Sequence, residues 1–204
     1  MMKCVFCKQP AGFFESYHDE CYNNVMATLK KLEGVINSYN KNHIDAKKAK
    51  ATLLDLVSSN RMYQNYLESQ IVNMQAIRTN EIAVYVEPGM RVSESKNRCK
   101  MVSTGYRYEK KPVWNEIESM IGNNTTIVIT DKAVYMIQVE KAMRYPYSKI
   151  VNLGYDEKGG YVYFDVKATS PYPHRFTIRS VNRKNDKTAN LCLFFNCLMG
   201  YQEK

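Results

Sequence analysis

Three cysteines and one histidine near the amino terminus form the clearest chemical pattern in this chain of 204 residues. Two residues separate Cys4 from Cys7, ten separate Cys7 from His18, and two more separate His18 from Cys21. Thiolates at this spacing bind one metal ion from a single tight turn, and a second pair of ligands completes a tetrahedral site. The spacing predicts a Zn²⁺ ion with four protein ligands. Such a site has no position open to water or substrate, so the expected role of the metal is structural.

Two other uses of these cysteines remain open at this point. In a secreted protein they would form disulfides, and a lone C-x-x-C motif can be a redox pair. The first ten residues, MMKCVFCKQP, contain neither an apolar signal-peptide core nor a cleavage site. The motif also does not follow a strand of a βαβ unit, where a redox pair is expected. We therefore expect a metal site in a reducing cytoplasm, and we interpret Cys192 and Cys197 as small core residues.

Composition limits the classes of partner. Apolar residues make up 45% of the chain, yet no apolar run is long enough to span a bilayer. The protein is thus expected to be cytoplasmic, either soluble or peripheral to the inner face of a membrane. Its net charge of +9 favours an acidic partner, which could be nucleic acid, an anionic lipid surface or an acidic protein.

The segment after the cysteines is expected to form a helical hairpin. Apolar residues recur at intervals of three and four over residues 25–39, and again over 53–74, where a kink is expected near residues 58–60. Asp45 is the expected N-cap of the second helix. The hairpin is either a spacer that forms a homo-oligomer or an element whose apolar stripe packs on the neighbouring domain.

From about residue 81 the apolar pattern changes to a period of two, which is typical of strands. Strands are expected at residues 82–86, 98–108, 125–130, 133–139, 142–147, 150–155, 161–166 and 174–179. Pro112 is expected to open a short helix over residues 113–121. A last helix should start at its N-cap Asp186 and stop before Gly200 as the C′ residue. We therefore predict an α+β protein of three parts: a zinc knuckle (1–23) covered by Phe13 and Phe14, a helical hairpin (24–78), and a partly open antiparallel β-barrel with a C-terminal helix (79–204).

Two segments carry a resemblance to a known family. Residues 125–137 (TTIVITDKAVYMI) and 144–151 (RYPYSKIV) resemble the central strand pair and the following "PYSKI" strand of bacterial PH-like and GRAM-like domains. The resemblance extends over about residues 81–200, and the basic segment 91–111 departs from the family pattern. The amino-terminal motif is similar to short zinc modules that precede such domains in bacterial or phage proteins.

The resemblance implies a PH/GRAM-like antiparallel β-barrel capped by the C-terminal helix. It also implies a non-enzymatic interaction or regulatory protein of a bacterium or phage, since such domains bind phosphoinositides, anionic membranes or protein partners.

Basic residues provide a separate reason to expect an anionic partner. They gather in segment 91–111, where Tyr106 and Tyr108 lie between them, and again near the C-terminal helix. The candidate binding residues are Arg91, Lys96, Arg98, Lys100, Arg107, Lys110 and Lys111 in the first cluster, and Arg175 and Arg179 in the second, which continues in Arg183, Lys184 and Lys187. Such a mixture can neutralise phosphates and interact with a polar ligand. The alternative is a solvated strand face whose alternation merely directs charges outward.

A nucleic-acid-binding protein that uses the zinc module and segment 91–111 is the second functional hypothesis. An enzyme is not expected, because the chain lacks a phosphate-binding loop, an H-E-x-x-H helix and a G-x-S-x-G elbow. The pair His174-Arg175 is the one weak indication of a nuclease or toxin, and a structural surface histidine is the simpler interpretation.

Overall fold

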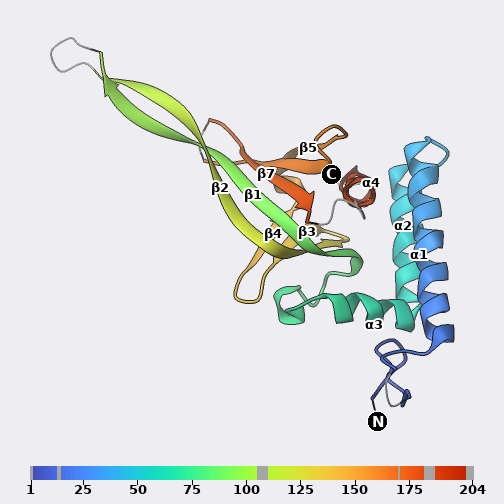
Figure 1. Ribbon diagram of the computed structural model, residues 1–204. Helices are drawn as coiled ribbons and strands as arrows, with labels where there is room; N and C mark the ends of the chain where they lie inside the picture. The colour runs from blue at the N-terminus through green and yellow to red at the C-terminus, as the bar shows by residue number, and fades with distance from the viewer. Residues whose placement is uncertain (1, 13–14, 105–109, 170, 182–186, 201–204) are drawn as a thin grey trace.

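The computed structural model describes residues 2–12, 15–104, 110–169, 171–181 and 187–200. Within these ranges the protein is a mixed α/β structure, with helices at the amino end, a curled antiparallel sheet of seven strands, and a helix at the carboxyl end (Figure 1). The expected class is confirmed at this level. Several sequence predictions fall outside the described residues, namely those for Phe13, Phe14, Tyr106, Arg107, Tyr108, Arg183, Lys184 and Asp186.

The amino-terminal helices are α1 (Asp19–Asn40), α2 (Ala46–Ser58) and α3 (Arg61–Gln70), followed by the 3-10 turn η1 (Met74–Ala76). Asp45 caps α2 as expected, because its carboxylate accepts a hydrogen bond of 2.7 Å from the Lys48 amide. The expected kink near residues 58–60 is a complete break between two helices. Asn60 caps α3 through the Tyr63 amide (3.0 Å) and donates to the Thr28 hydroxyl of α1 (2.7 Å). Asn60 therefore links the start of α3 to α1 of the hairpin, and α3 runs in a different direction from α1 and α2 (Figure 1).

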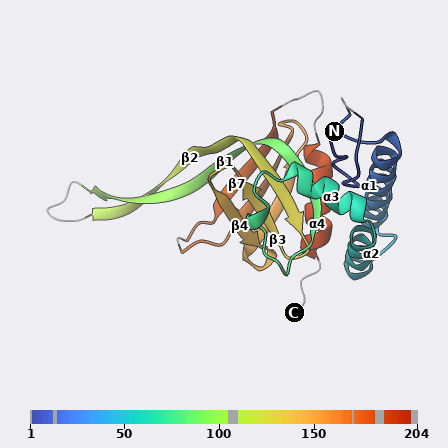
Figure 2. The same cartoon turned by 90° about the horizontal axis from the view of Figure 1, so that it is seen from below.

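The sheet has the strand order β4-β3-β2-β1-β7-β6-β5, and it is open between β4 and β5. Its strands are β1 (Ala83–Ser103), β2 (Lys110–Thr130), β3 (Ala133–Ile137), β4 (Ala142–Pro146), β5 (Ile150–Asp156), β6 (Tyr161–Val166) and β7 (His174–Ser180), with the 3-10 turn η2 (Tyr147–Lys149) between β4 and β5. All neighbours are antiparallel. The result is a curled half-barrel made of a four-strand and a three-strand meander (Figure 2).

Two sequence predictions about β1 and β2 are wrong. Strands were expected at 82–86 and 98–108 with a break between them, where the turn-forming pair Pro88-Gly89 lies, but both residues are inside β1, where the register with β2 shifts and Gly89 has a φ of +72°. A bulge and a turn favour the same residues, so the sequence signal does not separate them. The helix expected over residues 113–121 is part of β2. Val113, Ile117 and Ile121 are four residues apart, and this spacing keeps side chains on one face of a strand as well as of a helix.

Strands β1 and β2 extend far beyond the rest of the sheet (Figures 1 and 2). We call the paired segments 93–103 and 110–120 the arm; their register is continuous from Ser93 opposite Met120 to Ser103 opposite Lys110. Strand β7 pairs with β1 only as far as Ser95. Beyond this point, within the described part of the chain, the arm is a two-stranded ribbon. Residues 96–103 span about 25 Å at about 3.3 Å per residue.

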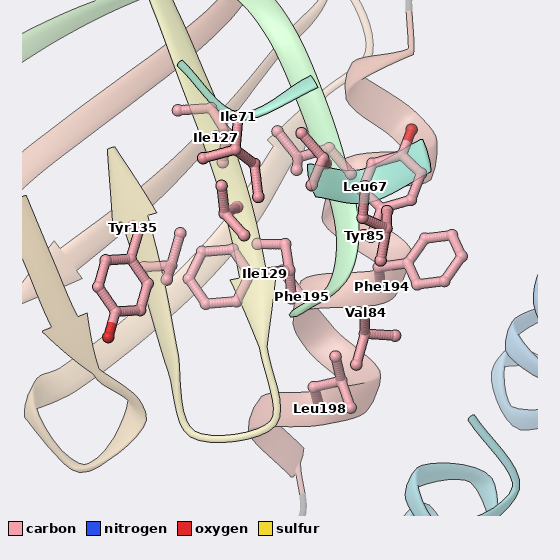
Figure 3. Packing of buried hydrophobic residues seen from close by; sticks show 14 of the residues in the cluster. Leu67, Ile71, Val84, Tyr85, Ile127, Ile129, Tyr135, Phe194, Phe195 and Leu198 are labelled. Atoms are coloured by element: carbon pink, nitrogen blue, oxygen red, sulfur yellow. The ribbon is translucent and has the colours of Figure 1, made fainter. Parts of the chain in front are cut away.

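Helix α4 (Thr188–Gly200) lies between the sheet and the helical hairpin (Figure 1). Gly200, expected just after this helix, is its last residue. Phe194 stacks on Tyr85 of β1 at 4.4 Å between ring centroids, and Phe195 lies 5.4 Å from Phe164 of β6. Figure 3 shows both rings, together with Leu198, within the core. A helix that contacts protein on two sides must be apolar around most of its circumference, which explains its sequence.

The helical hairpin buries its apolar stripe within the chain. Val25, Leu32 and Ile36 of α1 are at most 2% exposed, and Asn190 of α4 donates to Glu33 at 3.2 Å. This burial matches the second of the two expectations for the hairpin. A homo-oligomer formed through the hairpin stays a prediction.

A buried ion pair connects Glu81, two residues before β1, to β4 at the edge of the sheet. The Glu81 side chain is 1% exposed, and its carboxylate accepts a hydrogen bond of 2.9 Å from the Arg144 Nε of β4. The same carboxylate accepts from the hydroxyls of Thr130 and Tyr135, each at 3.0 Å. Three side chains thus donate to one buried charge, and the network depends on each of them.

Glu87 provides a test of how burial affects stability. Its carboxylate is buried near α4, accepts a hydrogen bond of 2.7 Å from the Tyr85 hydroxyl, and lies 3.7 Å from the Lys187 ammonium. Burial raises the pKa of Glu87 above its ordinary value of 4.5, although Tyr85 and Lys187 act in the opposite direction. The folded state therefore holds this proton more tightly than the unfolded state does.

The stability contributed by that proton is present below about pH 4.5 and is lost as the pH rises through the folded-state pKa. We expect Glu87→Gln to unfold at higher urea concentration than the wild type at neutral pH. Its free energy of unfolding should also fall less steeply as the pH rises from 4.5. If the stability of the wild type instead increased more steeply than that of the variant as the pH rises from 4.5, the pKa of Glu87 would not be raised in the folded state.

Candidate metal centre and basic surfaces

The four predicted metal ligands come together in space. The segment 3–10 folds back on itself through a bridge between Lys3 and Pro10, and the Cys4 amide donates to the Gln9 carbonyl at 2.8 Å. This turn presents Cys4 and Cys7. His18 is the N-cap residue of α1, and Cys21 lies in its first turn. The helix thus begins inside segment 1–23, and its amino end, where the backbone dipole is positive, faces the thiolates.

Distances within this group fit a tetrahedral ion. His18 Nδ1 lies 3.4 Å from Cys7 Sγ and 3.7 Å from Cys21 Sγ, and one donor atom from each of the four residues lies within 4.8 Å of the others. Zinc bonds of about 2.3 Å to sulfur and about 2.0 Å to nitrogen place such atoms about 3.5 Å apart. Three soft thiolates and one imidazole therefore form a donor set that could hold a metal ion.

A second contact orients the histidine. His18 Nε2 lies 3.0 Å from the carbonyl oxygen of Pro10 and donates to it, which leaves the lone pair of Nδ1 free for a metal. Metal-binding histidines in proteins commonly donate their other ring N–H to a carbonyl or carboxylate in this way, which fixes the tautomer and the ring orientation.

The thiols have opposite tendencies to ionise. Burial acts to raise the pKa of Cys4, but hydrogen bonds from nearby backbone amides, that of Cys7 foremost, lower it to about 6. Burial, together with the neighbouring Cys7 and Cys4, raises the pKa of Cys21 to about 12. Closely packed thiolates repel one another. A bound cation is therefore needed to stabilise all three cysteines in the deprotonated form. All six cysteines are free thiols, which does not favour the disulfide alternative.

The sequence did not reveal how the turn that carries Cys4 and Cys7 is fixed to the rest of the chain. Phe6 is 5% exposed and packs against Tyr17 and Tyr66, with ring centroids 5.6 and 6.1 Å away. The Asn65 side chain of α3 donates to the Phe6 carbonyl. Helix α3 in turn reaches the sheet, because Tyr63 donates to the Val84 carbonyl at 3.2 Å. Phe6 and Val5 are both apolar residues inside the C-x-x-C motif, and the aromatic residue there was the available sequence signal.

The structure separates the predicted basic residues onto two faces of the sheet. Arg91 and Arg179 are direct partners on β1 and β7, and Arg175 lies opposite Ser95 on the same, outer face. Arg175 is already neutralised, because Asp165 accepts from its Nε at 2.8 Å and from its Nη2 at 3.0 Å. This ion pair lowers the pKa of Asp165 and raises that of Arg175.

Lys96, Arg98 and Lys100 alternate with the outer-face residues of β1 and so lie on the other face. We call these three residues the basic face of the arm. Lys96 pairs with Glu94 at 3.1 Å, whereas Arg98 and Lys100 are exposed. The opposite face is acidic, since Glu116 and Glu118 accept hydrogen bonds from Ser95 and Ser93. Arg107 lies outside the described residues, and Lys110 and Lys111 are placed only by their backbone in β2.

His174 and Arg175 do not form a joint site. His174 Nδ1 lies 3.1 Å from the Glu94 carboxylate, whereas Arg175 points to the outer face and Asp165. Neighbouring residues of a strand direct their side chains to opposite faces. This geometry gives no support to the nuclease hypothesis.

Comparisons with known proteins add little. No protein-family model matches the chain, and no curated protein matches it. Among solved structures, a chain of "The 8S snRNP Assembly Intermediate" aligns with 63% of this chain and 89% of its own length, at 7% identity and a TM-score of 0.41. This likeness is too distant to support an argument about fold or function. Within the described residues, no helix has both the length and the apolar character needed to cross a bilayer.

Proposed function

We propose that this protein is a non-enzymatic interaction protein of the cytoplasm that binds an anionic membrane surface through the basic face of its arm. In this proposal a structural Zn²⁺ holds the amino-terminal segment, and the sheet with α4 is a PH/GRAM-like domain. The observation that carries the proposal is the arm, a protruding ribbon with bases on one face and carboxylates on the other.

The donor set supports zinc in particular. Three thiolates and one imidazole match the Cys₃His sites of structural zinc, whereas Ca²⁺ and Mg²⁺ prefer oxygen ligands. With all four positions taken by protein, the ion has no site at which to activate water. Cys4, Cys7, His18 and Cys21 would therefore hold the fold without contributing to a reaction.

The strand arrangement supports the PH/GRAM-like assignment. Strands β1–β4 and β5–β7 form two meanders that join through β1 and β7, and the carboxyl-terminal helix packs into the curl. The segments that carry the resemblance form the β2–β3 hairpin and the passage from β4 through η2 to β5.

The composition of the basic face favours a lipid surface. Aliphatic side chains lie between its charges: Val102 continues the alternation of Arg98 and Lys100, and Ile117 lies opposite Lys96. Val102 and Ile117 are 39% and 38% exposed. Bases attract the surface of an anionic membrane, and exposed aliphatic groups gain by entering the boundary between headgroups and acyl chains. The acidic face would then point into solution.

Nucleic acid is the second candidate, because a two-stranded ribbon fits the major groove of a duplex. The metal-binding segment adds little to that hypothesis, since Asp19 and Glu20 begin α1 beside the ligands. An acidic protein would meet the same charges but would not require the aliphatic residues.

Cosedimentation with vesicles tests the proposal. The wild type should sediment with phosphatidylserine-containing vesicles and not with neutral phosphatidylcholine vesicles. Each base near an anionic surface contributes about 1 kcal/mol, so Arg98→Gln/Lys100→Gln should weaken binding about 30-fold.

Two matched variants serve as controls. Lys47→Gln/Lys48→Gln removes the same charge from exposed positions on α2 and should change binding less than about twofold. Glu116→Gln/Glu118→Gln alters the opposite face of the arm and should not weaken binding. If the Arg98/Lys100 and Lys47/Lys48 variants lost vesicle binding equally, the basic face of the arm would not be the specific contact with the membrane. Binding of a DNA duplex that surpasses vesicle binding and falls steeply with salt would favour nucleic acid instead.

A further inference from the structure

Two arginines occupy directly opposed positions on neighbouring strands. Arg91 of β1 and Arg179 of β7 are register partners on the outer face, and both side chains are exposed. Like charges at such positions repel one another, because the Cβ atoms are only about 5 Å apart. Within the described part of the chain, neither arginine forms an ion pair. The repulsion therefore calls for a compensating anion.

These arginines border a hollow in the protein surface. It has a volume of about 430 Å³, and Lys158 and the backbone of Gly159 and Gly160, from the β5–β6 turn, complete its wall. Among the residues that the structure describes, Glu157 is the one carboxylate that lines it. Three cations against one anion leave the hollow with a charge of +2.

The wall of the hollow is fixed by local contacts. The Arg179 guanidinium lies 4.6 Å from the centre of the Tyr161 ring, a favourable arrangement of cation and aromatic face. The turn is closed by Asp156, whose carboxylate accepts from the Gly159 amide at 2.7 Å. A Cβ atom at Gly159 would collide with the Tyr161 ring, so this position requires glycine. The turn, the ring and the arginine thus support one another before any ligand binds.

We infer that this hollow is a binding site for a phosphomonoester group. Such a group carries a charge of about −1.5 to −2 at neutral pH, which matches the excess of the lining cations. Arg91 and Arg179 can each donate two parallel hydrogen bonds to phosphate oxygens, and Lys158 adds a third positive charge. A carboxylate, with one negative charge, would leave part of the repulsion uncompensated.

The site is separate from the basic face of the arm. Arg91 and Arg179 lie on the outer face of the sheet, whereas Arg98 and Lys100 lie on the other. The inference therefore goes beyond the proposed membrane contact and can hold or fail without it. Its ligand can be a soluble phosphomonoester or the headgroup of a lipid such as phosphatidic acid.

Titration with inorganic phosphate at constant ionic strength, followed by amide NMR of the full chain, tests the site. Saturable shifts are expected at Gly159 and Gly160, while chloride should give none. Arg91→Gln and Arg179→Gln should each weaken phosphate binding about tenfold or more, since each removes charged hydrogen bonds. Arg175→Gln is the control on the same face, because Arg175 is bound to Asp165 outside the hollow; it should leave binding unchanged.

The source of the ligand is tested with glycerol 3-phosphate and with vesicles of phosphatidic acid or phosphatidylserine. A loss of affinity for glycerol 3-phosphate in Arg91→Gln supports the site with a soluble ligand. A loss for phosphatidic acid, but not for phosphatidylserine, supports it with a lipid headgroup. The inference is overturned if phosphate gives no saturable shifts, or if the Arg91 and Arg179 variants retain wild-type affinity.

Discussion

Replacing Cys21 with serine is expected to abolish metal binding and to unfold the amino-terminal segment. A structural zinc site contributes about 10 to 16 kcal/mol of apparent binding free energy, which is comparable to the entire stability of a domain. Residues 2–12 bury only Cys4, Phe6 and Ala11, too few side chains to hold the segment without the ion. Amide NMR of Cys21→Ser should therefore show loss of dispersed signals for this segment, and elemental analysis should show less than one metal ion per chain.

The matched control is Cys99→Ser, which replaces an exposed thiol on the arm. This variant should retain the metal and the wild-type spectrum. A chelator added to the wild type should reproduce the spectrum of Cys21→Ser, and zinc should reverse its effect. If Cys21→Ser kept both the metal and the ordered segment, Cys21 would not be a ligand.

The second large effect is expected at the buried ion pair. Arg144→Met would leave the Glu81 carboxylate, with a side chain 1% exposed, without its cation. Breaking a buried pair from one side costs about 3 to 5 kcal/mol, because the remaining charge has no compensation. Urea denaturation should show this loss as a lower midpoint with an unchanged slope.

Two further variants make that result interpretable. Glu81→Gln/Arg144→Met contains no buried charge, and we expect it to recover a substantial part of the lost stability. Lys96→Gln disrupts the more exposed pair with Glu94 and should cost less than about 1 kcal/mol. If Arg144→Met lowered the free energy of unfolding no more than Lys96→Gln does, the network around Glu81 would not stabilise the fold as described.

The group of four residues that could hold a metal ion was predictable from the sequence because its signal is local. A C-x-x-C turn and a helix start that carries His18 and Cys21 require only short-range spacing, and the structure brings the four donors together. The zinc itself stays a proposal. Strands β3–β7 also followed from period-two patterns and turn residues, and α4 followed from its apolar helical pattern, signals that again act within a few positions.

The arm and the division of the basic residues could not be predicted in this way. Arg91 and Arg98 lie on opposite faces because residues 91–98 belong to one continuous strand, and Pro88-Gly89 hid that continuity because a bulge resembles a turn. Lys158 was missed because a lysine in a glycine-rich turn is an ordinary surface residue by sequence. Only the pairing of β1 with β7 places Arg91 beside Arg179. Lys158 of the β5–β6 turn then lines the same hollow as these two arginines.

X-ray absorption at the zinc edge of the purified protein tests the central claim, that the amino-terminal site is closed and structural, most directly. We expect one zinc per chain with three sulfur neighbours at about 2.3 Å and one nitrogen neighbour at about 2.0 Å. An absence of bound metal, or a spectrum with an oxygen ligand in place of one of the four protein donors, would contradict it.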